Sequence, residues 1–237
     1  MNIFVVLPTY NEADNLGRLV PALLELPVPL RVVVVDDNSP DGTGNLADAQ
    51  AAGQPDRVAV IHRPRKLGLG TAYLTGFRKA LADGADAVLT MDADFSHQPA
   101  AIPSLVERLA EADLVIGSRY VPGGGAVDSP FARRLLSRGA NLVAHALLGL
   151  RARDVTAGFR LYRRAVLESI PLDRIFSSGY SFLIEMLFLV QQRGWRIAEV
   201  PIQFHDREAG RSKVSRAEIG RAWYTVARLS YRRLRGR

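Results

Sequence analysis

Three polar clusters in this 237-residue chain have residue types that suit a nucleotide and a divalent metal ion. They occupy residues 8–12, 36–43 and 92–94, and each directly follows an apolar run that predicts a buried strand. Ligands of open α/β sheets bind beyond the carboxyl ends of the strands, so the three clusters should meet at one edge of one sheet. Acidic side chains gathered there are costly unless they bind something.

Asp92 and Asp94 are the most informative pair in these clusters. In an extended segment, side chains two positions apart point the same way. Two carboxylates on one side can hold Mg²⁺ or Mn²⁺, which would neutralise a diphosphate leaving group. An isolated Asp-x-Asp is also common in surface turns. Its place after a buried strand and beside two other acidic strand ends favours the metal site.

The second cluster begins with Asp36 and Asp37, directly after a β-branched run. A carboxylate there can accept hydrogen bonds from a ribose or a base. The alternative is helix capping by the turn at residues 41–43, and both roles can hold for different residues. The Leu-Gly-Leu-Gly-Thr segment at residues 67–71 resembles half of a dinucleotide loop. It lacks the G-x-G-x-x-G pattern and does not follow the first strand, which disfavours NAD binding.

Several other kinds of chemistry are disfavoured by the sequence. The chain has no cysteine, which excludes disulfides and thiolate metal sites and fits a reducing cytoplasm. The four histidines are far apart in sequence, and His145 falls in an apolar helix, where a satisfied core role is expected. No G-x-S-x-G motif is present, so an α/β-hydrolase would lack its nucleophile.

Strands and helices that alternate along the first half would position these clusters. Strands are expected at residues 3–7, 31–35, 57–61, 87–91 and 113–117, and helices at 15–26, 46–52, 71–82 and 102–110. This alternation predicts an α/β fold with a mostly parallel, doubly wound sheet. The run at residues 31–35 is continuously apolar after its Arg and should be buried on both faces.

The alternation breaks at Val-Pro-Gly-Gly-Gly, residues 121–125, where a flexible loop is expected. A helical stretch at 130–150 should follow, then a short strand and helix within 155–170. A helix at 180–192, a strand at 196–202 and an amphipathic helix at 214–235 complete the prediction. No linker divides the chain, so we expect a catalytic domain over residues 1–213 and a basic C-terminal helix over 214–237.

The formal charge of +7 is concentrated at the C-terminal end. Residues 207–237 contain ten Arg or Lys and two Glu, a surplus of eight positive charges. Such a segment seeks the phosphates of lipid or nucleic acid, unless it is simply a solvated helix. The longest apolar stretches, 140–150 and 181–190, are well short of the ~20 residues that span a bilayer.

The final helix has the pattern of a membrane-surface helix. Apolar residues recur at helical spacing among cationic ones, and such a helix can lie among lipid headgroups. The apolar positions are Ile219, Trp223, Val226 and Leu229, and the cationic positions are Arg221, Arg228, Arg232 and Arg233. The alternative is that the apolar face packs on the core or on a partner protein.

The motifs taken together resemble one enzyme family. They are PTYNE (8–12), VDDNSPDGT (35–43), LGLGTAY (67–73), MDADFSHQP (91–99), GSRY (117–120), SRGAN (137–141), GFRLY (158–162), GYSF-x-x-EM (179–186) and RSK-x-S (211–215). The chain resembles the polyprenol-phosphate mannosyltransferases, or dolichol-phosphate mannose synthases, of the family-two inverting glycosyltransferases. The resemblance implies a GT-A fold, which is a Rossmann-like, mostly parallel sheet flanked by helices, with a helical C-terminal region.

The resemblance also implies roles for individual residues. The nucleotide would be held by Pro8, Tyr10, Glu12, Val35 and Asp37, and the diphosphate and metal by Asp92, Ala93 and Asp94. The donor would also contact Arg119, Arg207 and Lys213, and the acceptor phosphate would contact Arg133 and Ser137. Two positions depart from the family. Ser96 replaces a Gln that serves some relatives as a metal ligand, so its hydroxyl, or a water, would join Asp92 and Asp94 on the metal. Ala157 replaces a Ser.

The implied reaction transfers mannose from GDP-mannose to polyprenyl phosphate with inversion, on the cytoplasmic face of a membrane. An acceptor phosphate is already ionised near neutral pH, so no strong general base is required. UDP-glucose or another nucleotide sugar remains an alternative donor, and a non-catalytic nucleotide-sugar-binding module is an alternative function. A nucleic-acid-binding role is disfavoured because no recognised motif is present. A separate membrane subunit that recruits the protein is left open.

Overall fold

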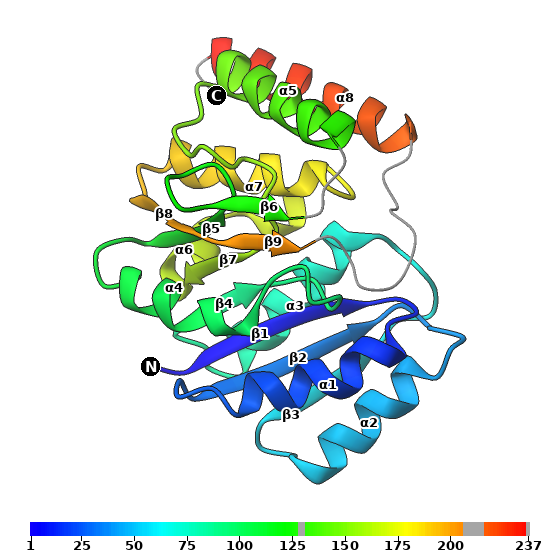
Figure 1. The fold of residues 1–237 in the computed structure, drawn as a ribbon. Helices are drawn as coiled ribbons and strands as arrows, with labels where there is room; N and C mark the ends of the chain where they lie inside the picture. Colours follow the sequence, from blue (N-terminus) through cyan, green and yellow to red (C-terminus); the bar gives the residue numbers. More distant parts are fainter. Residues whose placement is uncertain (128–130, 206–215, 236–237) are drawn as a thin grey trace.

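A computed structural model describes residues 1–127, 131–205 and 216–235 of the chain. A seven-stranded sheet forms its centre, with strand order β3-β2-β1-β4-β7-β5-β8 (Figure 1). All neighbouring strands pair in parallel except β7, which is antiparallel to both β4 and β5. The predicted α/β class with a mostly parallel sheet is confirmed.

The elements closely follow the predicted ones. The strands are β1 (Ile3–Thr9), β2 (Leu30–Asp36), β3 (Val58–His62), β4 (Ala87–Thr90), β5 (Leu114–Ser118), β6 (Gly125–Val127), β7 (Arg160–Arg163), β8 (Ile197–Pro201) and β9 (Gln203–His205). The helices are α1 (Ala13–Leu24), α2 (Thr43–Gly53), α3 (Leu69–Ala82), α4 (Ile102–Arg108), α5 (Phe131–Leu148), α6 (Arg164–Ser169), α7 (Ser181–Gln192) and α8 (Arg216–Leu234). Short 3₁₀ turns cover Pro99–Ala101 and Leu172–Arg174.

Apolar clusters cover both faces of the sheet because side chains alternate along each strand. On β1, Val5 joins a cluster that includes residues of α1, α2 and α4, whereas Val6 joins one that includes residues of α3 and α7. Residues 32–35 of β2 are all buried, which confirms the expectation for that strand.

Helix α7 is buried along almost its whole length. Every residue from Ser181 to Val190 is buried, as expected for a helix that is apolar on all sides. It lies between the sheet and the pair formed by α5 and α8 (Figure 1). Val226 and Leu229 of α8 belong to the same apolar cluster as α7, so part of the predicted amphipathic face packs on the core. No helix within the described residues is long and apolar enough to cross a membrane.

The structure differs from the predicted elements in two places. Gly125 was expected in a loop, but it begins β6, which pairs in parallel with β9. Three-residue strands carry too little periodicity to be recognised in a sequence. The fourth strand ends at Thr90, and residues 93–97 form bends in which Phe95 has φ of 57°. Asp92 and Asp94 therefore do not share one side of an extended strand, and that prediction is wrong. The domain boundary at residue 213 stays a prediction.

Candidate active site

The first two polar clusters meet at the carboxyl ends of β1 and β2. The register pairs Thr9 with Asp36, and Thr9 Oγ1 donates a hydrogen bond to Asp36 Oδ1 at 3.0 Å. Asp36 is buried and also accepts hydrogen bonds from the backbone N–H and the hydroxyl of Ser39. Ser39 in turn accepts the N–H of Asn11. Asp36 therefore joins the two strand ends, which is a structural role.

The turn after Asp37 supplies the predicted helix capping. Asp41 accepts the backbone N–H groups of Thr43 at 3.0 Å and Ala13 at 3.1 Å, so it serves the starts of α2 and α1 together. Burial raises the pKa of Asp41, but these hydrogen bonds and that of the Thr43 hydroxyl outweigh it, and the net pKa is lowered. The capping alternative thus holds for Asp41.

Asp37, a predicted nucleotide ligand, organises the glycine-rich loop. It forms an ion pair with Arg63 in which both side chains are buried, and it accepts the Leu67 N–H at 3.2 Å. Arg63 also donates to Thr71 Oγ1 at 2.7 Å and to the Gly68 carbonyl at 3.2 Å. The loop before α3 is therefore fastened to the end of β2.

The remaining predicted nucleotide residues surround this edge. Pro8, Tyr10 and Glu12 are half-buried, and Val35 is buried. Lys66, which the sequence analysis did not single out, places its Nζ 4.0 Å from the centroid of the Tyr10 ring. This ammonium adds positive charge to the predicted nucleotide region.

The Asp92–Asp94 segment places oxygen atoms at the end of β4. Asp94 and Ser96 are buried, and Asp94 Oδ1 accepts the Ser96 N–H at 3.1 Å. Asp92 is half-buried and accepts the Tyr73 hydroxyl at 3.4 Å. Ala93 between the two carboxylates is buried.

The chemistry of these groups fits the predicted metal. The Ser96 hydroxyl oxygen is buried and has no hydrogen-bond partner among the described residues. Two carboxylates and a hydroxyl are hard oxygen donors of the kind that Mg²⁺ and Mn²⁺ prefer. Within the described ranges, no group of three or more His, Cys, Asp or Glu side chains is placed to hold a metal. The described residues would therefore supply only part of the ligand set, and phosphate and water can complete it.

His97 also belongs to this site. The sequence analysis did not single it out, because it lies far from the other histidines in the sequence. Its Nδ1 accepts the backbone N–H of Asp92 at 3.2 Å, which places the ring proton on Nε2. The ring stacks on Phe159 with centroids 5.0 Å apart. Burial lowers the pKa of His97 and outweighs the opposing effects of Asp92 and Asp94, so the ring is neutral near pH 7. The signal available in the sequence was its place five residues after Asp92.

Arg119 follows β5 directly and is fixed by Asp154, which the sequence analysis missed. Nε and Nη2 of Arg119 donate to Oδ2 and Oδ1 of Asp154, both at 2.8 Å, and Nη2 also donates to Thr156 Oγ1 at 2.9 Å. The backbone N–H of Arg119 reaches Oδ2 at 3.1 Å. Within the described residues no hydrogen bond of Nη1 is found, and its two N–H groups can donate to a ligand.

Both members of this pair are charged. Burial works against each charge, but the mutual hydrogen bonds and attraction outweigh it. The pKa of Asp154 is consequently lowered and that of Arg119 raised. Asp92 also contributes to the raised pKa of Arg119, and the Arg119 charge in turn acts on His97. The charged groups at the ends of β4 and β5 therefore act on one another's pKa values.

Four predicted ligands cannot be placed. Arg207 and Lys213 lie outside the described residues. Arg133 and Ser137 lie on α5, but their side chains are also outside the description.

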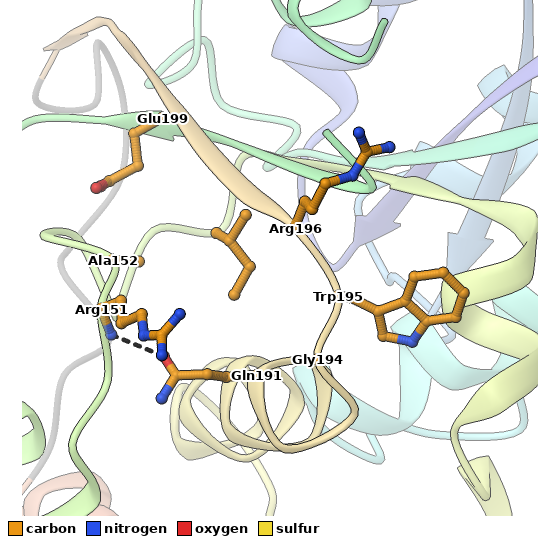
Figure 2. Close-up of a pocket in the computed structure, with 8 residues that line it drawn as sticks. Arg151, Ala152, Gln191, Gly194, Trp195, Arg196 and Glu199 are labelled. Carbon is orange, nitrogen blue, oxygen red and sulfur yellow. Dashed lines mark hydrogen bonds between the residues drawn. The ribbon is translucent and has the colours of Figure 1, made fainter. Parts of the chain in front are cut away.

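A cavity of about 420 Å³ lies apart from this site, beside the start of β8 (Figure 2). Its lining includes none of the predicted site residues. It is formed by Arg151, Ala152, Gln191, Gly194, Trp195, Arg196, Ile197 and Glu199. Since ligands of such sheets bind beyond the carboxyl ends of the strands, this position does not suit the donor.

A family model described as glycosyl transferase family 2 matches residues 4–170. The chain is 47% identical over 228 residues to an undecaprenyl-phosphate mannosyltransferase of Micrococcus luteus, covering 96% of this chain and 93% of that protein. It is 47% identical over 224 residues to a polyprenol monophosphomannose synthase of Mycolicibacterium smegmatis, covering 94% and 84%.

Solved structures show the same architecture. A glucosyl-3-phosphoglycerate synthase from Mycobacterium tuberculosis, in complex with Mn²⁺, UDP and glucosyl-3-phosphoglycerate, aligns with a TM-score of 0.67 at 25% identity. The alignment covers 98% of this chain and 79% of that one. A second structure of that enzyme, with Mg²⁺ and UDP, gives a TM-score of 0.66 at 24% identity, covering 96% and 77%. The GT-A fold is therefore confirmed.

Proposed function

The chain belongs to glycosyl transferase family 2, and from that premise we propose that it transfers mannose from GDP-mannose to polyprenyl phosphate. The products would be polyprenyl phosphate mannose and GDP, with inversion at the sugar carbon. One observation carries the proposal. The chain is 47% identical, over 96% of its length, to a relative named as an undecaprenyl-phosphate mannosyltransferase.

The edge formed by β1 and β2 would hold the nucleotide. We assign this role to Pro8, Tyr10, Glu12, Val35 and Asp37, as the family resemblance implies. Support comes from the hydrogen bonds that fasten the 67–71 loop to the end of β2, because a fixed loop gives the nucleotide a preformed wall. Lys66, above the Tyr10 ring, adds a positive charge that suits an anionic donor.

The end of β4 would hold the diphosphate. Asp92, Asp94 and Ser96 are assigned as ligands of Mg²⁺ or Mn²⁺, with Ala93 beside the diphosphate. When bound, the cation would supply charge neutralisation to the departing diphosphate. Arg119 would donate the two N–H groups of Nη1 to the same phosphates, and its fork on Asp154 would orient them.

The reaction requires no strong general base from the protein. An acceptor phosphate oxygen would form a bond to the anomeric carbon while the bond from that carbon to the GDP oxygen breaks, and its electron pair leaves with GDP. The acceptor oxygen is already ionised, so a neutral His97 is compatible with the chemistry. Catalysis would come from the positioning of donor and acceptor and from cationic groups that offset the negative charge of their phosphates. Arg133, Ser137, Arg207 and Lys213 are assigned to acceptor and donor phosphates on the resemblance alone.

The acceptor is a lipid, so we also propose peripheral attachment to the cytoplasmic membrane face. The pair α5 and α8 presents large exposed side chains to solvent, and arginines lie among them on α8. The exposed fractions are 70% for Leu142, 46% for Leu147, 55% for Trp223, 62% for Tyr224 and 53% for Tyr231. Aromatic and cationic side chains together suit lipid headgroups. A membrane subunit seated on the same surface is the competing proposal.

UDP-glucose is the second candidate donor. The observation in its favour is the fold similarity to an enzyme whose structures contain UDP or UDP-glucose. Parallel transfer assays with radiolabelled GDP-mannose and UDP-glucose, at equal concentrations and with one short polyprenyl phosphate, separate the two. We expect product from GDP-mannose at least tenfold faster. Faster transfer from UDP-glucose would overturn the choice of donor but keep the reaction class.

A further inference from the structure

The segment that carries Asp154 is held by another carboxylate, that of Glu199 on β8. Glu199 Oε2 accepts the backbone N–H of Arg153 at 2.7 Å, and Oε1 accepts that of Asp154 at 3.0 Å. Glu199 lies in register with Ile116 of β5, so the clamp is anchored on the central sheet. Because each carboxylate oxygen takes a separate N–H, the two bonds fix the backbone from which Asp154 projects.

Asp154, held in this way, in turn fixes the side chain of Arg119. Its carboxylate is fully buried and accepts Nε, Nη2 and the backbone N–H of Arg119. A guanidinium held at two of its nitrogens and at its own backbone can turn very little. The direction of Nη1, the part left for a ligand, is therefore set by the position of Asp154.

We propose that Glu199 is a positioning residue for Arg119, acting through the backbone of Arg153 and Asp154. Glu199 contacts no substrate in this proposal. It sets the place of Asp154, which aims the Arg119 guanidinium at the donor phosphates. The inference rests on the proposed function, because the donor phosphates are the ligand assigned to Arg119 there.

The position of Glu199 makes the proposal testable by truncation. Its side chain borders the cavity beside β8, facing the segment with Arg151 and Ala152 (Figure 2). Because Arg153 is exposed and polar side chains border the cavity, water can reach the Arg153 N–H that a truncated side chain leaves. We therefore expect Glu199→Ala to fold.

A double-mutant cycle separates positioning from simple structural support. In the wild-type background, Glu199→Ala should lower kcat/KM about tenfold, because misplacement of a catalytic group costs rate steeply. With Arg119→Lys, the fork and its direction are already lost, so adding Glu199→Ala should change kcat/KM less than twofold. Glu199→Gln keeps one carbonyl acceptor and should fall between wild type and Glu199→Ala.

The matched control is Asp113→Asn. Asp113 binds Arg196 through the same three contacts, from Nε, Nη2 and the backbone N–H, but at the opposite end of β5. Asp113→Asn should change kcat/KM less than twofold, both with Arg119 and with Lys at position 119. Equal losses from Glu199→Ala with Arg119 and with Lys at position 119 would overturn the proposal, as would full activity of Glu199→Ala.

A second readout does not depend on sugar transfer. The Nε–H signals of Arg119 and Arg196 in ¹⁵N-arginine-labelled protein report the two forks separately. Glu199→Ala should shift the Arg119 signal and speed its exchange with water, and it should leave Arg196 unchanged. An unchanged Arg119 signal would overturn the positioning role even in an active enzyme. If wild type transfers no mannose, the proposed function fails, while this signal still decides whether Glu199 orders Arg119.

Discussion

Arg119 and Asp154 form a two-pronged ion pair at the end of β5, with both side-chain contacts at 2.8 Å. Arg196 and Asp113 repeat the arrangement at the start of the same strand, at 3.0 and 3.1 Å. The side chains of the first pair are 16% exposed for Arg119 and 0% for Asp154, whereas the Arg196 side chain is 65% exposed. One strand thus carries two pairs of equal geometry, one beside the candidate site and one remote from it.

The remote pair predicts a pH dependence of stability. Hydrogen bonds from Arg196, first that of its side chain, lower the pKa of Asp113 below its usual value of 3.8. A lowered carboxyl pKa contributes stability that is fully present above the unfolded value and is lost as pH falls through the folded value. Asp113→Asn should therefore destabilise the protein at pH 7, and the difference from wild type should shrink below about pH 3.8. Urea unfolding at pH 7 and at pH 3 measures both. A difference that stays constant or widens at pH 3 would contradict the assignment.

Removal of the Ser96 hydroxyl is expected to weaken metal binding without changing the stability of the fold. Its buried hydroxyl oxygen has no hydrogen-bond partner among the described residues, so Ser96→Ala should leave the melting temperature nearly unchanged. If the hydroxyl is a metal ligand, the variant should need about tenfold more Mn²⁺ for half-maximal GDP binding, which corresponds to ~1.4 kcal/mol. Calorimetric titration of GDP at several Mn²⁺ concentrations gives the value. An unaltered Mn²⁺ requirement would remove Ser96 from the ligand set.

The sequence was sufficient for most of the fold because the strands are apolar runs bounded by polar turns. Val32 to Val35 show this most clearly, since they are continuously β-branched and buried on both faces. The sequence could not reveal that β7 enters the sheet between β4 and β5, because strand order depends on long-range packing. It also predicted that Asp92 and Asp94 share an extended segment, whereas the strand ends at Thr90.

The missed site residues share a physical reason. Asp154 and Glu199 act through partners 35 and 45 residues away in the sequence, and the segment around Asp154 has no periodic pattern that fixes its place. His97 reaches Asp92 across a bend, and a bend leaves no hydrophobic periodicity. Arg119 was found only because the family resemblance included it.

Close approach of α3 to the sheet predicts a strong effect at Gly76. A Cβ there would lie 2.2 Å from a methyl carbon of Val6, which is fully buried on β1. Gly76→Ala should destabilise the protein by about 1–3 kcal/mol because the core must be displaced. Gly220 of α8 is the control, since no described atom outside the backbone of its own helix lies within 4 Å of its added Cβ. Gly220→Ala should therefore stabilise the protein by up to ~1 kcal/mol. Denaturant unfolding compares the two, and similar effects of both substitutions would refute the packing argument.

The exposed face of α8 predicts membrane affinity. Trp223 and Tyr231 are more than half exposed, whereas Val226 is buried. Replacing both Trp223 and Tyr231 with Ala should reduce cosedimentation with anionic phospholipid vesicles at low salt by about tenfold or more. The reason is that the two aromatic side chains that would be buried among the lipid headgroups are removed. Val226→Ala serves as the control, since it changes the core and should retain vesicle binding if the protein stays folded. Absence of vesicle binding by wild type would favour a protein partner for this surface.

Mannosyl transfer is tested most directly by incubating the protein with labelled GDP-mannose, a short polyprenyl phosphate and Mg²⁺ or Mn²⁺. Wild type should form polyprenyl phosphate mannose, chelation of the metal should abolish it, and Asp94→Ala should lower the rate at least ~10²-fold, because a metal ligand beside the leaving group is lost. GDP binding and the melting temperature serve as the checks that the variant is folded. Wild type that binds GDP and metal yet forms no mannolipid, or Asp94→Ala with unaltered transfer, would contradict the proposed reaction and its site.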